Sequence, residues 1–256
     1  MIKLKLNMIK LNIIKVALAL ICISCAPNGT PSSELNSKIS QEIKDFNPAK
    51  NQEYYKKPKA LKLETIPEYL KYLEDQKNEE DEKIAKISSS SSDFLNTFEV
   101  SSDNDSKFKL DTGNLMRFKR IIYSSLNYET QKINTLKEIL GKIKEKKTKQ
   151  KNEKIKDFFA QIAVGMQKAI EKSNVDMENK KNSNQEEKDA EEEKDAALKR
   201  TKELLNSKEE FTKRLNVIIQ AYNQNHNNIQ TDEEKLADYI DEHCQYFAHF
   251  KIISYQ

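Results

Sequence analysis

The sequence contains few residues that interrupt helices. Its 256 residues include only five prolines and four glycines. Every proline lies within the first 67 residues, so residues 68–256 contain none. Proline removes a backbone donor and breaks helices, and glycine favours turns. A proline-free stretch of this length argues against a turn-rich β-protein. It predicts an all-α fold, a bundle of about six or seven helices behind a disordered N-terminal tether.

Cysteine is also scarce, with only Cys22, Cys25 and Cys244 in the chain. Cys22 lies in the N-terminal leader and Cys25 directly follows the expected cleavage site, where we expect it to be lipidated. Cys244 is then the one cysteine left, so no internal disulfide is expected. Cys244 is either a buried apolar residue or the site of an intermolecular bridge. The apolar-rich segment around it, residues 239–250, favours burial.

Residues that commonly perform catalysis are sparse. The only histidines are His226, His243 and His249. His243 and His249 are six residues apart, which places them on different faces of a helix, where they cannot share a metal ion. We interpret them as partly exposed or core-edge imidazoles. No nucleophile elbow, zinc-protease, paired-cysteine or nucleotide-binding glycine motif is present. We therefore expect a protein that is not an enzyme and that has no metal site and no cofactor.

The N-terminus has the order of a bacterial lipoprotein signal. Residues 1–15 carry four lysines and no acidic residue, and the apolar run VALALICISCA follows at residues 16–26. This run is shorter than the roughly 20 apolar residues that a transmembrane helix needs. Ile23 and Ser24 before Cys25 resemble a lipobox, which predicts that residues 1–24 are removed and Cys25 is acylated. Two or three acyl chains anchor a protein stably. The alternative is an ordinary cleaved signal.

Removal of residues 1–24 leaves an almost neutral chain. The four leader lysines reduce the 44 basic residues to 40, against 41 acidic ones. This balance argues against a nucleic-acid-binding protein. Residues 25–64 are polar and dotted with proline, which predicts a flexible tether. Residues 65–256 are then the helical bundle domain.

Capping boxes and apolar stripes mark the expected helices. The first expected helix begins at Thr65 and ends at the serine run from Ser88 to Ser92. We expect the polar middle of this helix to be exposed. Apolar residues keep a helical spacing from residue 115 to 143, which predicts one kinked helix or two helices joined tightly at Asn127. Another helix opens at Asn152. Boxes of the S/T-x-x-E type predict helix starts at Thr65–Glu68, Ser207–Glu210 and Thr231–Glu234.

Two blocks of charge stand out. Residues 141–156 contain eight lysines against two glutamates, and residues 186–195 contain seven acids against two lysines. The basic block is either a patch for an anionic host surface such as glycosaminoglycan, or a solvated junction balanced by the acidic block across the bundle. We favour the second interpretation. The basic block lacks interleaved aromatic residues, which disfavours nucleic acid as a ligand.

The C-terminal segment has a wide apolar belt. One terminal helix is expected from residue 231, with Cys244, Phe247 and Phe250 facing inward. Tyr246, Ile252 and Tyr255 widen the belt beyond one stripe. Such a belt is either buried centrally in the bundle or shared with a second subunit. We favour central burial, with homodimerisation through this segment as the alternative.

Several stretches resemble one family of bacterial surface proteins. These are the leader MIKLKLNMIKLNIIK…LICISCAP and the blocks LEDQKNEEDEKIAKI, DFLNTFEV, KRIIYSSLNYETQKINTLKEIL and AYNQNHNNIQTDEEKLADYI. They resemble the paralogous outer-surface lipoproteins of Lyme-disease spirochaetes, the family that includes the complement regulator-acquiring surface protein that binds factor H. The terminal EHCQYFAHFKIISYQ departs from that member, whose C-terminal helix is associated with dimerisation.

The resemblance implies a helical bundle displayed on the cell outer membrane. It also implies binding of a host serum protein, either a complement regulator or a terminal complement component, in aid of immune evasion. It identifies no individual ligand-binding residues. One alternative is an adhesin for glycosaminoglycan or extracellular matrix that uses residues 141–156. The other is a structural or antigenic surface lipoprotein without a dedicated ligand.

Overall fold

The computed structural model describes residues 64–88, 110–149, 154–182 and 188–254. The leader, the tether up to residue 63, the segment DFLNTFEV and Asn152 lie outside these residues. Within them the chain forms seven α-helices and a short 3₁₀ helix, with no strand, which confirms the all-α prediction. The elements are α3 (Ile66–Ser88), α4 (Thr112–Ser125), α5 (Thr130–Lys142), α6 (Ile155–Asn182), α7 (Lys188–Asn223), η3 (His226–Asn228), α8 (Glu233–Gln245) and α9 (Ala248–Ser254).

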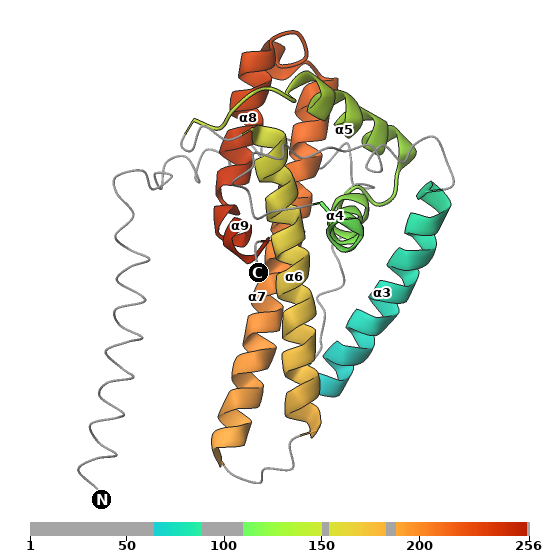
Figure 1. Cartoon of the computed structure of the whole chain (residues 1–256), viewed down its shortest axis with the longest axis vertical. Helices are drawn as coiled ribbons and strands as arrows, with labels where there is room; N and C mark the ends of the chain where they lie inside the picture. Colours follow the sequence, from blue (N-terminus) through green and yellow to red (C-terminus); the bar gives the residue numbers. More distant parts are fainter. Residues whose placement is uncertain (1–63, 89–109, 150–153, 183–187, 255–256) are drawn as a thin grey trace, which may run out of the picture. The chain divides into compact units, whose positions relative to one another are not determined.

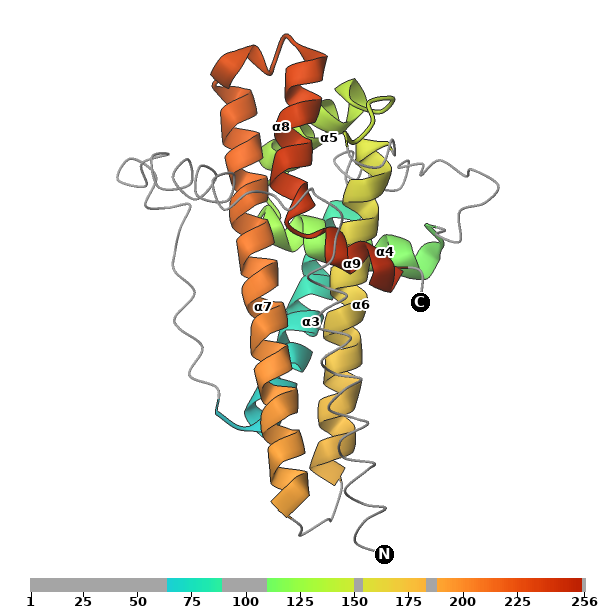
Figure 2. The same ribbon diagram turned by 90° about the vertical axis from the view of Figure 1, so that its left-hand side faces the viewer.

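Helices α6 and α7 are the longest elements and run side by side along their length (Figures 1 and 2). Helix α8 packs along one end of this pair, and α9 lies across α6. Helices α4 and α5 cover another side of the same end, and α4 crosses the pair instead of running along it. Helix α3 lies beside α6 and contacts α4.

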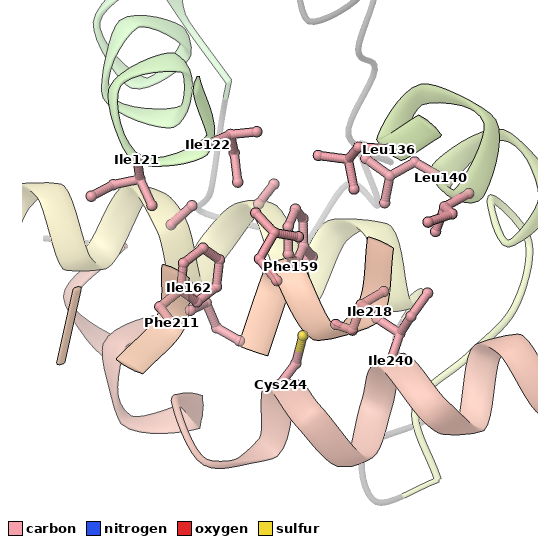
Figure 3. Close-up of a cluster of buried hydrophobic side chains, with 14 of the residues drawn as sticks. Ile121, Ile122, Leu136, Leu140, Phe159, Ile162, Phe211, Ile218, Ile240 and Cys244 are labelled. Atoms are coloured by element: carbon pink, nitrogen blue, oxygen red, sulfur yellow. The ribbon is translucent and has the colours of Figure 1, made fainter. Parts of the chain in front are cut away.

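The main core lies where α4, α5, α6, α7 and α8 converge (Figure 3). A series of aromatic rings crosses it. The ring centroids of Phe118 and Phe159 are 6.2 Å apart, those of Phe159 and Phe211 are 5.7 Å apart, and those of Phe211 and Phe247 are 5.3 Å apart. These residues come from four separate segments of the chain, so the rings tie the bundle together across its width.

The first predicted helix start and the predicted joint are both present. Helix α3 begins at Ile66, directly after Thr65, whose backbone N–H donates to the Glu68 carboxylate at 3.0 Å. It ends at Ser88, where the serine run begins. Helices α4 and α5 are separate and meet at Asn127 and Tyr128, which both have positive φ, of 52° and 59°. A residue in the left-handed backbone conformation ends a helix abruptly, which produces the tight joint between α4 and α5.

The second predicted helix start is wrong. Helix α7 runs without a break from Lys188 to Asn223, through the Ser207–Glu210 box. The Ser207 hydroxyl donates instead to the backbone carbonyl of Glu203, four residues earlier in the same helix. A capping box and a helix interior can share the same residue types, and the apolar stripe through Phe211 keeps the helix intact.

The terminal segment differs from the prediction in two ways. Asp232, rather than Thr231, caps α8, because its carboxylate accepts from the backbone N–H groups of Glu234 and Lys235, each at 3.1 Å. The expected single helix is instead two, since α8 ends at Gln245 and α9 begins at Ala248. The break turns α9 across α6.

Gly165 permits this close crossing of α9 over α6. A Cβ atom on Gly165 would lie 1.8 Å from the backbone oxygen of Phe250. The Lys168 ammonium also donates to the carbonyl of Ser254 at 2.8 Å, which fixes the far end of α9. The lack of a side chain at Gly165 therefore allows α9 to pack directly against the backbone of α6.

Candidate interaction surface

The described residues contain no group of three or more His, Cys, Asp or Glu side chains suited to a metal ion. None of the helices within these ranges is long and apolar enough to span a membrane. A hollow of about 460 Å³ lies between α5 and α8. Its lining is almost entirely charged, unlike the mostly apolar walls of small-molecule sites. The lining residues are Glu138, Gly141, Lys142, Lys144, Glu145, Lys146 and Glu233.

His243 is more deeply buried than the sequence predicts. It is 1% exposed, whereas we expected a partly exposed or core-edge imidazole. Its ring lies 4.6 Å from that of Tyr239. Burial, together with the positive charge of Arg214, lowers the pKa of His243 from 6.5 to about 3. His243 is thus a neutral part of the core at physiological pH.

Cys244 is buried, as the sequence predicts. It is 2% exposed, and its sulfur points into the cluster formed by Phe159 and Ile218 (Figure 3). Burial raises the pKa of the Cys244 thiol to about 12. A protonated, enclosed thiol is inert and does not reach a second subunit in this conformation. The structure therefore supports burial over an intermolecular bridge.

The basic block 141–156 is balanced by acids of α5 and α8 and by a glutamate of the block itself. Its ion pairs in the described part of the chain include Lys142–Glu138 (3.4 Å), Lys146–Glu234 (2.6 Å), Lys149–Asp238 (2.9 Å) and Lys154–Glu145 (2.8 Å). The predicted balance by residues 186–195 is therefore wrong for these lysines. In that acidic block Glu193 pairs with Lys180 of α6. Paired lysines offer less positive charge to a polyanion than the sequence suggests.

The most distinctive surface feature lies at the turn between α8 and α9. Tyr246 is 46% exposed, although large hydrophobic residues are mostly buried in this bundle. Its ring is stacked on Arg214 of α7, whose guanidinium carbon lies 4.6 Å from the ring centroid, and packs edge-on against Phe247. Glu210 in turn accepts from Arg214 Nε at 3.0 Å. We call Tyr246, Arg214 and Glu210 the aromatic ledge.

The aromatic ledge holds an exposed ring in a fixed position. The side chain of Arg214 is only 5% exposed, and it is held by Glu210 on one side and by the rings on the other. Tyrosine and arginine are both enriched among the residues that dominate protein–protein binding. The sequence placed Tyr246 in the apolar belt but gave no signal for Arg214, because the two residues meet only through the packing of α8 on α7.

A sequence profile described as "Borrelia Bbcrasp-1 domain containing protein" matches residues 74–254. The chain belongs to this Borrelia Bbcrasp-1 domain family. The solved structures similar to it include two of the membrane attack complex assembly inhibitor BGA71 from the Lyme disease agent Borreliella bavariensis. One has 32% sequence identity and a TM-score of 0.59, and covers 72% of this chain and 97% of that chain. The other, from native data, has 33% identity and a TM-score of 0.60, with 73% and 98% covered. No curated protein matches the chain.

Membership of the Bbcrasp-1 domain family confirms the resemblance seen in the sequence. The identity to BGA71 means that about two thirds of the aligned residues differ. The fold is therefore shared, while a surface feature such as the aromatic ledge must be argued from the residues of this chain.

Proposed function

We propose that the protein is a non-enzymatic surface lipoprotein that binds a complement component and protects the cell that displays it. The supporting observation is the likeness to a membrane attack complex assembly inhibitor, which extends over 97–98% of that protein's chain at 32–33% identity. The proposed target is therefore a step in the assembly of the membrane attack complex. Binding of a complement regulator is the other form of the proposal, favoured by the family resemblance.

The aromatic ledge is our candidate for the contact surface. Its ring is exposed, yet its position is fixed by Arg214, so little side-chain entropy is lost when a partner covers it. Val175 of α6 is also exposed, at 54%, but has no comparable support from a buried cation. A single exposed aliphatic residue is common on protein surfaces and needs no functional explanation.

Display on the outer membrane is proposed to depend on Cys25. Acylation there would fasten the mature chain, and residues 25–64 would hold the helical domain away from the lipid surface. Incorporation of labelled palmitate tests the anchor. The label should be lost in Cys25→Ala, and label that persists in this variant would contradict acylation of Cys25.

The activity is tested with the lipid-free mature chain, residues 26–256, in human serum. We expect dose-dependent inhibition of complement lysis of erythrocytes, and recovery of a terminal complement component in a pull-down analysed by mass spectrometry. Recovery of a complement regulator without inhibition of terminal assembly would favour the regulator form. No complement protein in the pull-down, together with normal lysis, would contradict both forms.

The role of the aromatic ledge is tested by comparing substitutions at two exposed large hydrophobic residues, Tyr246 and Val175. Tyr246→Ala should weaken inhibition at least tenfold, because it removes the exposed ring, whereas Tyr246→Phe should retain most of it. Val175→Ala is the matched control and should leave inhibition unchanged. Equal loss in Tyr246→Ala and Val175→Ala would exclude a specific role for the ledge, and thermal melts confirm that each variant is folded.

Self-association through the C-terminal segment is an alternative use of the aromatic ledge, because a dimer that covers Tyr246 would hide it from a complement component. The inner residues of that segment are used within one chain, since Phe247 and Phe250 are 0% and 2% exposed. A homodimer would therefore use the exposed ring of Tyr246 rather than the buried stripe. Light scattering of the lipid-free chain, compared with Tyr246→Ala, measures whether a dimer forms and whether this residue contributes.

A further inference from the structure

Helix α3 is attached differently from the other long helices. At its N-terminal end Ile66 and Tyr69 pack with Met177 of α6 and Ala197 of α7, in a cluster separate from the main core. We call this the flank cluster. At the other end Ile84 and Ile87 join the main core. Between these ends, residues 74–83 contain no apolar side chain.

Ion pairs hold the polar middle of α3. Lys208 of α7 donates to Glu80 at 2.8 Å, and Arg120 of α4 donates to Asp81 at 2.6 Å. Glu80 is 8% exposed, although the sequence predicted that this region faces solvent. These ion pairs are only partly buried, since the Asp81 side chain is 42% exposed. Such pairs favour one register of a helix but add little net stability, because the charges lose part of their hydration. Apolar contact at the two ends therefore provides most of the attachment.

The surface beneath α3 has the features of a helix-binding groove. Its floor at the flank cluster is apolar, formed by Met177, Ala197 and Leu205 of α6 and α7. Cations line its edge, since Lys202 lies 5.8 Å from the Tyr69 ring and Lys208 pairs with Glu80. An amphipathic helix in an apolar groove is a common mode of protein recognition. In this structure α3 of the same chain lies in the groove.

We propose that α3 is a releasable helix, and that the groove it vacates binds an acidic amphipathic helix of a partner protein. The partner helix has the chemistry of α3 itself. It carries apolar residues at the spacing of Ile66, Tyr69 and Leu73, followed by carboxylates that meet Lys208 and Arg120. This proposal does not depend on complement as the target, because it follows from the groove and its charges alone.

Release of α3 is tested by hydrogen exchange of the mature chain carrying Cys25→Ala. The amides of α3 should exchange at least a hundredfold faster than those of residues 155–170 in α6, because α3 opens without unfolding the core. Raising the salt concentration should speed exchange in α3 more than in α6, since salt screens the ion pairs. Equal protection of α3 and α6 would overturn the proposal.

Binding in the groove is tested with a fluorescent peptide of residues 64–88 as the probe. In the chain, the double variant Glu80→Lys and Asp81→Lys repels Lys208 and Arg120 and should free the groove. The peptide should bind this variant at least tenfold more tightly than the unmodified chain, as measured by anisotropy. A melting transition and helical circular dichroism should remain, because Ile84 and Ile87 are the only described α3 residues buried in the main core and its other helices keep their contacts.

Charge reversal provides the matched control. A peptide carrying both Glu80→Lys and Asp81→Lys should bind the double variant at least tenfold more weakly than the natural peptide, because it meets Lys208 and Arg120 with like charges. Three results would overturn the proposal. These are equal binding to the unmodified and double-variant chains, binding that is indifferent to the charges at positions 80 and 81 of the peptide, and a double variant that does not fold. The last would show that α3 is an obligatory part of the bundle.

Discussion

The region around α6, α7, α8 and α9 and the region around α3 are held together by different forces. The first is a continuous apolar core crossed by four phenylalanine rings. The second combines a small flank cluster with ion pairs over a polar middle. Apolar burial contributes about 25 cal/mol per Å², whereas partly exposed ion pairs contribute little. The comparison indicates that most of the stability resides in the main core, to which α3 contributes only Ile84 and Ile87 among the described buried residues. The proposed release of α3 rests on this difference.

The largest expected effect is the loss of a central ring. Phe211→Ala removes the ring that contacts both Phe159 and Phe247. We expect a loss of about 3–5 kcal/mol in the free energy of unfolding, measured by urea titration. A loss below about 1 kcal/mol would contradict the view that these rings form the centre of stability.

The next effect concerns the crossing of α6 and α9. Gly165→Ala places a Cβ 1.8 Å from the Phe250 carbonyl oxygen, so α9 must move. We expect a loss of about 1–3 kcal/mol, measured by urea titration. Gly141→Ala in α5 is the matched control, because nothing lies within 4 Å of its new Cβ. There alanine should be neutral or stabilising, by up to about 1 kcal/mol. Equal effects would show that α9 is free to shift.

The sequence predicted local features of the fold but not its long-range contacts. Local signals predicted the start of α3, its end at Ser88 and the joint at Asn127, because each depends on residues close in the chain. The same signals failed at Ser207, where a continuing apolar stripe outweighed a capping box. They could not reveal the contact of Gly165 with Phe250 or of Arg214 with Tyr246. Those contacts join distant residues and depend on how α8 and α9 turn after Gln245.

A third prediction tests the core through pH. His243 has a folded pKa of about 3, below its ordinary value of 6.5, so the unfolded chain binds the extra proton between these values. Its contribution to stability is complete above pH 6.5 and is lost as the pH falls towards 3. At pH 5 the loss attributable to this residue is about 2 kcal/mol.

Carboxylates also titrate in this range, so a matched variant is needed to isolate His243. His243→Gln keeps a polar side chain but has no proton to gain. Urea titrations of both proteins at pH 7 and pH 5 should show a steeper fall in the unmodified chain. Parallel curves would show that His243 is not held neutral by the core.

The smallest expected effect on global stability is in α3, and it sharpens the comparison most directly. Tyr69→Ala removes a ring that is 2% exposed, nearly as buried as Phe211. If burial alone decided the outcome, the two substitutions would cost similar amounts. Because Tyr69 packs only in the flank cluster, its loss should instead detach one end of α3. The global free energy of unfolding should fall by about 1 kcal/mol or less, while hydrogen exchange in α3 accelerates and that in α6 does not. A global loss equal to that of Phe211→Ala would mean that α3 unfolds together with the core, and that the two regions are one cooperative unit.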